Sequence, residues 1–286
     1  MNWIDELGTA LRYMEEHLTE KSVIEDVAKH IYISDFYFQK AFSMLCGFTA
    51  GEYVRRRRLT LAGSELACSD NKVIDIALKY GYDSPDSFTK AFTRFHGATP
   101  TAVRRDGAML RAFAPLKLQF TLEGGNIMDY RIVKKEAFTV MGKSKRFSFD
   151  TAFGEIPKFW DEVRGAEGNT VCDMFGVCID SCNETGKFEY LIADNYTPWE
   201  DVPEGCKAVT IPSLTWAVFP SRGPLPGSVQ QTNRKIFSEW LPNCKDYEVS
   251  DHFNIELYSP PQQFPKGTED ENFYTEIWIP VKEKNR

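Results

Sequence analysis

The spacing of hydrophobic residues along the chain changes near residue 128. Before this point, apolar residues recur at three- and four-residue intervals, which is the pattern of one buried helix face. Phe38, Ala41, Phe42 and Leu45 show it clearly. After this point, runs rich in Val, Ile, Phe and Tyr predict strands, and two helical segments interrupt them. The pattern predicts two domains: an all-α domain followed by an α+β domain.

The helical half contains a repeat with a period of 50 residues. Residues 34–42 and 84–92 share Ser, Phe, Lys, Ala and Phe at matching positions, and Gly47 and Gly97 follow at the same offset. An internal repeat has to be found first, because it determines the architecture that is predicted.

Each copy of the repeat has the end signals of a helix. Ser34 and Ser84 suit N-cap positions, where a hydroxyl accepts a hydrogen bond from a free backbone N–H. A short amphipathic helix is predicted before each copy, at residues 23–30 and 73–81. Helix, tight turn and capped second helix form a helix-turn-helix unit, whose second helix enters the DNA major groove. Two units of this kind are predicted.

Residues 1–107 resemble the DNA-binding domain of AraC/XylS-family transcription regulators. The matching segments are residues 24–28, 34–42, 53–59, 76–82, 84, 88–92 and 97–100. The resemblance implies two helix-turn-helix units joined by a long helix at residues 49–68. It implies base contacts from Phe36, Gln39 and Lys40 in the first unit, with Asp86, Thr89 and Lys90 at the corresponding places in the second. The other DNA-binding candidates are Tyr37, Ser43, Arg55, Ser87 and Arg94.

The resemblance has two departures. The glycine often found in the first turn is absent from residues 30–33, and Pro85 and Asp86 are poor partners for phosphates or base edges. The second unit is therefore expected to bind DNA more weakly. The interpretation requires Gln39 and Lys40 to project from the same side as Thr89 and Lys90, open to a duplex.

Net charge alone does not indicate a nucleic-acid-binding protein. The chain has 34 Lys and Arg residues and 41 Asp and Glu residues, which give a net charge of −7. Placement is more informative. Residues 36–58 hold five basic residues and one acidic residue, and residues 87–105 hold four basic residues and no acidic one. A local basic face is sufficient for phosphate neutralisation. The alternative interpretation of the four arginines at 55–58 is a solvated helix face.

Residues 108–127 are predicted to be a weakly structured linker, and residues 128–286 the second domain. Its strands are expected at residues 130–141, 171–180, 188–193, 215–219, 253–258 and 274–281, and its helices at residues 151–163 and 228–241. The order strand, helix, strand, strand occurs twice. Two such halves would form an antiparallel sheet with helices on one side.

This second domain resembles the gyrase-inhibitor-like effector-binding domain of multidrug-type regulators. The matching segments are residues 128–133, 175–178, 208–212, 217–224, 238–242, 255–260 and 275–280. The resemblance implies a cleft between the halves for aromatic or cationic small molecules, and a ligand-facing carboxylate at Glu256. On strand alternation Glu256 shares a face with Asn254 and Tyr258. The other candidates for the effector site are Tyr258, Glu276, Trp160, Phe175, Tyr190, Trp216 and Trp278. A solvated sheet face is the alternative for both carboxylates, and core packing is the alternative for the aromatic residues.

The remaining patterns argue against several other classes of protein. No run of 18 apolar residues predicts a membrane span, and the first residues do not resemble a signal peptide, so a cytoplasmic protein is expected. Seven cysteines without a CxxC pair indicate neither a disulfide framework nor a metal site. No cofactor is expected.

We therefore expect a regulator, not an enzyme, with double-stranded DNA and a small-molecule effector as partners. One alternative is a small-molecule hydrolase that uses Glu256 and Tyr258, fused to a DNA-binding module. Another is constitutive DNA binding, with a second domain that recruits a partner such as RNA polymerase.

Overall fold

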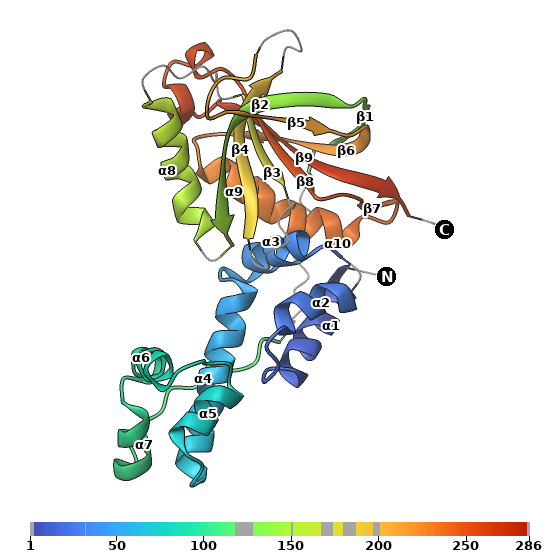
Figure 1. Cartoon of the computed structure of the whole chain (residues 1–286). Coiled ribbons are helices and arrows are strands. Elements are labelled where there is room, and N and C mark those ends of the chain that lie inside the picture. Colours follow the sequence, from blue (N-terminus) through green and yellow to red (C-terminus); the bar gives the residue numbers. More distant parts are fainter. Residues whose placement is uncertain are drawn as a thin grey trace. The chain divides into compact units, whose positions relative to one another are not determined.

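The chain forms two compact units (Figure 1). The computed structural model describes residues 3–31, 33–117, 128–149, 151–166, 174–179, 187–196 and 201–284. One unit consists of Met1–Asp35 and Phe48–Glu123, and the other of Phe36–Gly47 and Gly124–Arg286. The two units follow the predicted change from helices to strands, except that Phe36–Gly47, the core of the first repeat, belongs to the second unit.

The first unit is all-α, as predicted. Its helices are α1 (Trp3–Glu16), α2 (Val23–His30), α4 (Ala50–Cys68), α5 (Val73–Lys79), α6 (Pro85–His96) and α7 (Pro100–Asp106). The second repeat has the predicted caps: the Ser84 hydroxyl accepts a hydrogen bond from the Ser87 N–H, and Gly97 ends α6 with a φ of 81°. Positive φ is strained for residues with a Cβ, so glycine favours this end point.

The apolar faces of α4, α5 and α6 meet in one core. Phe88 and Phe92 of α6 are fully buried with Ile76, Ala77 and Leu66. The chain after α7 covers part of this unit, because Phe113 packs against Phe48 and Tyr53. Residues 108–117 of the predicted linker are therefore attached to the first unit, and residues 118–127 lie outside the described part of the chain.

The second unit contains a single antiparallel sheet with helices. Its elements are α3 (Asp35–Cys46), β1 (Arg131–Lys135), β2 (Phe138–Ser148), α8 (Ala152–Arg164), β3 (Phe175–Ile179), β4 (Lys187–Asn195), β5 (Lys207–Ile211), β6 (Leu214–Arg222), α9 (Gly227–Lys235), α10 (Leu241–Asn243), β7 (Tyr247–Val249), β8 (Phe253–Tyr258) and β9 (Tyr274–Glu283). A π-helical turn, Ile236–Trp240, joins α9 to α10. The α+β class is confirmed.

The predicted duplication is visible in the strand order. Among the described strands the order is β1-β6-β9-β8-β3-β4-β2-β5, and β7 pairs with β9. Each half contributes three consecutive neighbours, and β3 and β8 meet in the middle of the sheet with Gly176 opposite Glu256. Each half also lends an edge strand to the other, since β1 pairs with β6 and β5 pairs with β2.

The two faces of the central strands have different surroundings. Val177 and Ile255 point into an apolar core that also holds Phe175, Trp216 and Trp278. Because side chains alternate along a strand, the neighbouring residues Cys178 and Glu256 lie on the opposite face. That face holds the candidate site described below.

Some strands differ from the prediction. The run at 130–141 is split into β1 and β2, and the short strands β5 and β7 were not predicted as strands. Edge strands such as β5 pair on one side and are largely exposed, so they lack a long apolar run. A three-residue strand such as β7 is too short to show a period.

Candidate functional site

The second repeat presents its predicted DNA-reading residues to solvent. On α6, Asp86, Ser87, Lys90 and Arg94 are exposed and Thr89 is half-buried. Phe88 and Phe92 hold the opposite face of the helix in the core. The face of α6 that carries the predicted reading residues is therefore exposed, and its contact with DNA stays a prediction.

The four consecutive arginines of α4 have different roles. Arg55 is exposed and remains a candidate for a phosphate contact. Arg57 is buried, and its guanidinium donates to both carboxylate oxygens of Glu15 at 2.9 Å. Arg58 donates to the carbonyls of Leu18 and Glu20 at 2.5 Å. Neither a basic face nor a solvated face describes the whole run, because a helix turns successive residues by 100°.

The first repeat places its predicted reading residues differently from the second. The side chains of Phe36, Tyr37, Gln39 and Ser43 are buried, and Lys40 is half-buried. Gln39 is only 3% exposed, so the expected opening of this side chain to a duplex is not found. On the same helix, Phe36 packs against Phe149 and Phe188 of the α+β unit, to which Phe36–Gly47 belongs.

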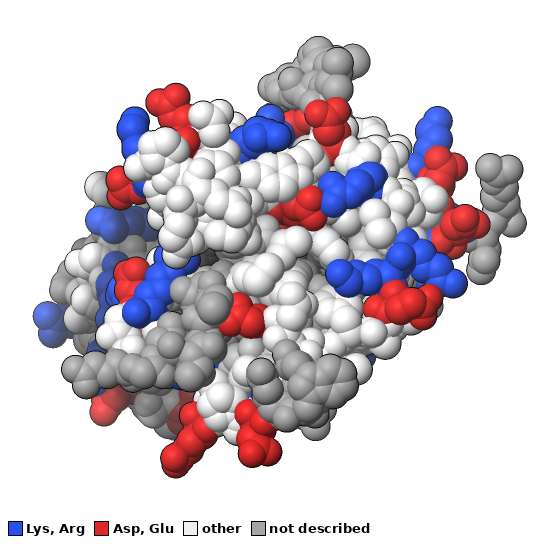
Figure 2. Space-filling model, turned by 90° about the horizontal axis from the view of Figure 1, so that it is seen from above, with Lys and Arg blue, Asp and Glu red and all other residues white. Residues whose placement is uncertain are grey.

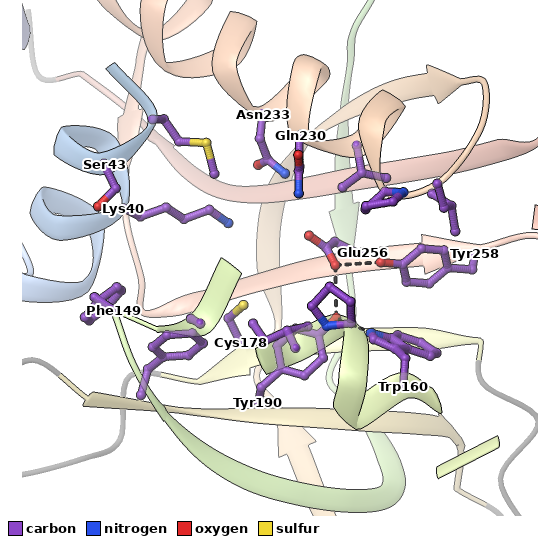
Figure 3. Close-up of a pocket in the computed structure, with 18 of the residues that line it drawn as sticks. Lys40, Ser43, Phe149, Trp160, Cys178, Tyr190, Gln230, Asn233, Glu256 and Tyr258 are labelled. Carbon is purple, nitrogen blue, oxygen red and sulfur yellow. Dashed lines mark hydrogen bonds between the residues drawn. The ribbon is translucent and has the colours of Figure 1, made fainter. Parts of the chain in front are cut away.

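A cavity of about 300 Å³ lies in this second unit, on the helix-covered face of the sheet (Figure 3). Cavities of this size suit small organic ligands. Its walls are mainly apolar and aromatic. They come from α3, α8, β3, β4, α9 and β8, and from residues between elements, such as Phe149 and Leu225. The wall residues include Phe36, Met44, Phe149, Ile156, Trp160, Phe188, Tyr190, Val229 and Tyr258.

Glu256 lies at the centre of a hydrogen-bond network in this cavity. The hydroxyls of Tyr190 and Tyr258 donate to Glu256 Oε2 at 3.0 and 2.7 Å (Figure 3). The Trp160 indole N–H donates to the Tyr190 oxygen at 3.1 Å. The sequence predicted all four of these residues as candidates, and the structure brings them together. The carboxylate, which is held by two phenols, can attract a cation. The neighbouring indole and phenol rings can stack on aromatic rings of that cation.

The opposite strand makes room for this network. Gly176 faces Glu256 across the β3–β8 pair, and a Cβ on Gly176 would lie 2.1 Å from the Tyr190 hydroxyl oxygen. A side chain at this position would displace the phenol that donates to Glu256. The sequence shows Gly176 inside an apolar strand but does not show what approaches it.

Burial keeps the two phenols and the thiol around Glu256 protonated. It raises the pKa of Tyr190 and of Tyr258 well above the ordinary value, and the Glu256 charge adds to both shifts. Burial likewise raises the pKa of Cys178 to about 12. At neutral pH the phenols are therefore hydrogen-bond donors, and the thiol is not a nucleophile.

Of the residues that the structure describes, four charged ones line the cavity. Glu256 and Lys40 are partly buried, whereas Asp161 and Arg164 are exposed. Lys40 Nζ donates to Asn254 Oδ1 at 2.5 Å. The sequence assigned Lys40 to DNA and did not place it in an effector site, because only the tertiary structure brings α3 to the sheet.

The other candidates for the effector site lie elsewhere. Phe175, Trp216 and Trp278 are in the apolar core on the other face of the sheet, which was the alternative interpretation for the aromatic residues. Glu276 is buried on that face as well, where it accepts hydrogen bonds from Arg131, Tyr274 and Trp278. Its pKa is lowered by these three donors against the effect of its own burial.

Two polar atoms in the cavity wall were not predicted as effector contacts, although Ser43 was a candidate for DNA binding. Ser43 Oγ and Asn233 Oδ1 are buried and have no hydrogen-bond partner among the described residues. Buried polar atoms are normally paired, so each marks a place where a ligand could bind. Asn233 lies on α9, within the helix predicted at residues 228–241, where the sequence indicated no candidate site residue.

Comparison with known proteins establishes the class of the chain. Residues 131–281 match the family model for integron-associated effector binding proteins, and residues 27–106 match the model for a helix-turn-helix domain. The first match spans more than half of the chain, which therefore belongs to this effector-binding family.

Curated relatives show a second relationship. The HTH-type transcriptional activator AarP of Providencia stuartii is 39% identical over 98 residues, which are 34% of this chain and 73% of AarP. The transcriptional regulator Rob of Salmonella typhimurium is 30% identical over 158 residues, which are 54% of this chain and 52% of Rob. The chain is an AraC-type DNA-binding transcription regulator with a C-terminal effector-binding domain.

Among solved structures, SAV2435 bound to tetraphenylphosphonium is similar to part of this chain. The match covers 54% of this chain and 94% of SAV2435, with 24% sequence identity and a TM-score of 0.45.

The described residues contain neither a candidate metal site nor a candidate membrane span. No group of three or more His, Cys, Asp or Glu side chains in this part of the chain could hold a metal ion. No helix there is both long and apolar enough to cross a bilayer.

Proposed function

We propose that the C-terminal domain senses an aromatic or apolar cation, which binds beside Glu256. The observation that carries this proposal is the Glu256 carboxylate in an aromatic cavity, with the hydroxyls of Tyr190 and Tyr258 on one oxygen. A carboxylate in apolar surroundings is costly unless it is paired. A cation with aromatic rings would pair with the charge and stack on Trp160 and Tyr258.

The proposal is tested by calorimetric titration of the full chain with methyltriphenylphosphonium, a lipophilic aromatic cation. Triphenylphosphine oxide, which is neutral and similar in shape, is the matched ligand. We expect the cation to bind at least about 10-fold more tightly, a difference of about 1.4 kcal/mol. Equal affinity for both compounds, or no binding of either, would overturn the proposal.

The Glu256→Gln variant should remove this preference, because the amide keeps the shape of the side chain without its charge. Glu276→Gln is the matched variant, since Glu276 is a buried carboxylate outside the cavity. It should leave the affinity for methyltriphenylphosphonium within about 2-fold of the parent. An equal loss in both variants would show that total charge, and not the cavity, determines binding.

For the DNA-binding half we propose that α6 and α3 are the reading helices, and that the chain activates transcription. The exposed face of α6 and the relationship to the activator AarP support this proposal. Lys90→Ala and Arg55→Ala should each weaken DNA binding in gel-shift assays and reduce its salt dependence. If both variants keep the DNA affinity and the salt dependence of the parent, these contacts are ruled out. An activator acts on RNA polymerase, which is the proposed protein partner and is tested by transcription in vitro.

The hydrolase alternative would use the same Glu256–Tyr258 pair, which lies within hydrogen-bonding distance at 2.7 Å. The raised pKa of Tyr258 keeps its hydroxyl protonated, and a protonated phenol is a poor nucleophile. We therefore propose sensing as the function. Turnover of an electrophilic ester that disappears in Glu256→Gln would support the alternative.

A further inference from the structure

Helix α3 carries the predicted reading face of the first helix-turn-helix, and the same face lines the effector cavity. Phe36, Lys40 and Ser43 were all predicted to contact DNA, and all three line the cavity together with Met44. Figure 3 shows Lys40 extending from α3 towards the side of the cavity that holds Glu256. The cavity wall and the reading face therefore share three side chains, those of Phe36, Lys40 and Ser43.

Specific contacts hold this face of α3 against the sheet. The Phe36 ring packs on Phe149 and Phe188, with ring centroids 5.6 and 5.7 Å apart. The Tyr37 hydroxyl donates to the Phe253 carbonyl at 2.8 Å. Lys40 Nζ donates to Oδ1 of Asn254, the next residue of β8, at 2.5 Å. Apolar packing and two hydrogen bonds thus support the same arrangement.

This arrangement and DNA reading exclude each other. A side chain that reads a base edge must be open to the major groove, and recognition helices bind with that face on the DNA. Phe36 and Gln39 are at most 3% exposed. The equivalent residues of α6, Asp86 and Thr89, are exposed and half-buried. In this state only the second reading helix presents its face to solvent.

We propose that α3 docks against the sheet as one wall of the effector site. We propose further that an effector cation and DNA both favour the release of α3 from the sheet. The proposal rests on the cation site proposed above. A cation beside Glu256 would compete with Lys40 for the acidic and polar wall of the cavity. Release of α3 would then free Gln39 and Lys40 to enter the major groove, so the effector increases DNA affinity.

The electrostatics of the cavity support this competition. The pKa of Cys178, already raised by burial, is also affected by the charges of Lys40 and Glu256, so both charges lie near the thiol. A second cation in a partly buried cavity is repelled by Lys40, and water screens this repulsion only partly. Because binding free energies are linked, DNA must raise the affinity for the effector by the same factor as the effector raises that for DNA.

The first test measures DNA binding by the full chain, with a duplex selected from random sequences. Saturating methyltriphenylphosphonium should increase the affinity at least about 5-fold, the lower end of typical allosteric coupling. Asn254→Ala, which removes the acceptor for Lys40, should raise the affinity without ligand and reduce the gain on adding it. Asn243→Ala is the matched control, because Asn243 is exposed and should change neither value.

The second test measures the exposure of α3 directly. Gln39→Cys and Thr89→Cys are matched, because positions 39 and 89 are equivalent in the two repeats. Maleimide labelling, located by peptide mass spectrometry, should be slow at position 39 without ligand and at least several-fold faster with methyltriphenylphosphonium. Labelling at position 89 should be fast in both conditions.

The results separate this inference from the function on which it rests. If methyltriphenylphosphonium does not bind, the proposed cation site fails, and with it the effect of the ligand on α3. If the cation binds but neither DNA affinity nor labelling at position 39 changes, the sensing site stands and the release of α3 is overturned. Unchanged DNA affinity in a folded Asn254→Ala variant would also count against α3 docking as an inhibitory contact.

Discussion

At the residue scale, the effector site depends on side chains that are close in space and distant in the sequence. Tyr190 and Glu256 are 66 residues apart, and their hydrogen bond forms across β3, where Gly176 leaves space for the phenol. Strand alternation correctly predicted that Glu256 and Tyr258 share a face. It could not show that Gly176 is the residue that allows Tyr190 to reach them.

Gly176→Ala should therefore weaken effector binding without removing any polar group. The added methyl would lie 2.1 Å from the Tyr190 oxygen, so the phenol must move and its bond to Glu256 is lost. We expect affinity for methyltriphenylphosphonium to fall about 10-fold, as for loss of one hydrogen bond to a charge. Calorimetric titration gives the value. Gly154→Ala on α8 is the control, since its Cβ meets nothing within 4 Å, and a similar loss there would refute the explanation.

At the element scale, polar residues attach the segment after α7 to the helices of the first unit. His96, at the end of α6, donates from Nε2 to the Leu59 carbonyl at 3.0 Å, and its Nδ1 accepts from the Arg111 N–H at 3.1 Å. These two roles specify a neutral imidazole. Burial is the main cause that lowers the pKa of His96.

This imidazole should make the stability of the first unit depend on pH. In the unfolded chain His96 has an ordinary pKa near 6.5, so below that pH the unfolded state binds the proton more readily. The free energy of unfolding should then fall on acidification, by at most about 1.4 kcal/mol per pH unit from this residue. Urea unfolding followed by helical circular dichroism at pH 7.5 and 5.5 measures it. His96→Gln should reduce the difference between the two pH values, and an unchanged difference would exclude His96 as the cause.

The arginine run of α4 offers a second prediction at this scale. Arg57 and Glu15 form a largely buried pair, with side chains 9% and 25% exposed, whereas the side chains of the Arg56–Glu52 pair are 36% and 35% exposed. Breaking a buried pair strands a charge. Arg57→Ala should lower the free energy of unfolding by about 3 kcal/mol, and Arg56→Ala by at most about 1 kcal/mol.

Denaturant unfolding of both variants under the same conditions gives these values. The Tyr53 hydroxyl also donates to Glu15 at 2.7 Å, so part of the loss in Arg57→Ala will reflect this shared network. Similar losses in the two variants would mean that burial of the Arg57–Glu15 pair is not the deciding difference.

At the scale of the whole molecule, the net charge does not indicate whether the protein binds DNA, because the local placement of basic residues matters more. On the face shown in Figure 2, basic and acidic side chains are interspersed, without a continuous basic surface. The net charge of −7 agrees with this mixture. The exposed basic residues that the repeats predict for DNA, such as Lys90 and Arg94, belong to one helix face. An acidic chain can therefore still carry a DNA-reading surface.

The repeats also explain why the class of protein could be predicted from the sequence. The period of 50 residues is visible in the sequence itself. The serine caps and the glycine helix ends are local signals, because each acts on the backbone within a few residues. The matched relatives confirm the resulting class. The duplicated α+β domain was predicted in the same way, from strand and helix periods. β5 was missed because it is largely exposed and lacks an apolar run, and β7 was missed because three residues are too few to show a period.

The sequence by itself determined the helices, the main strands, the two repeats and the face shared by Glu256 and Tyr258, because each follows from backbone periodicity. Only the tertiary structure decided that Trp160 and Tyr190 join Glu256, whereas Phe175, Trp216 and Trp278 form a core. It also decided that α3 belongs to the α+β unit and brings Lys40 into the cavity. Periodicity shows that a helix has a buried face and a polar face, but the partner of each face depends on contacts between distant parts of the chain.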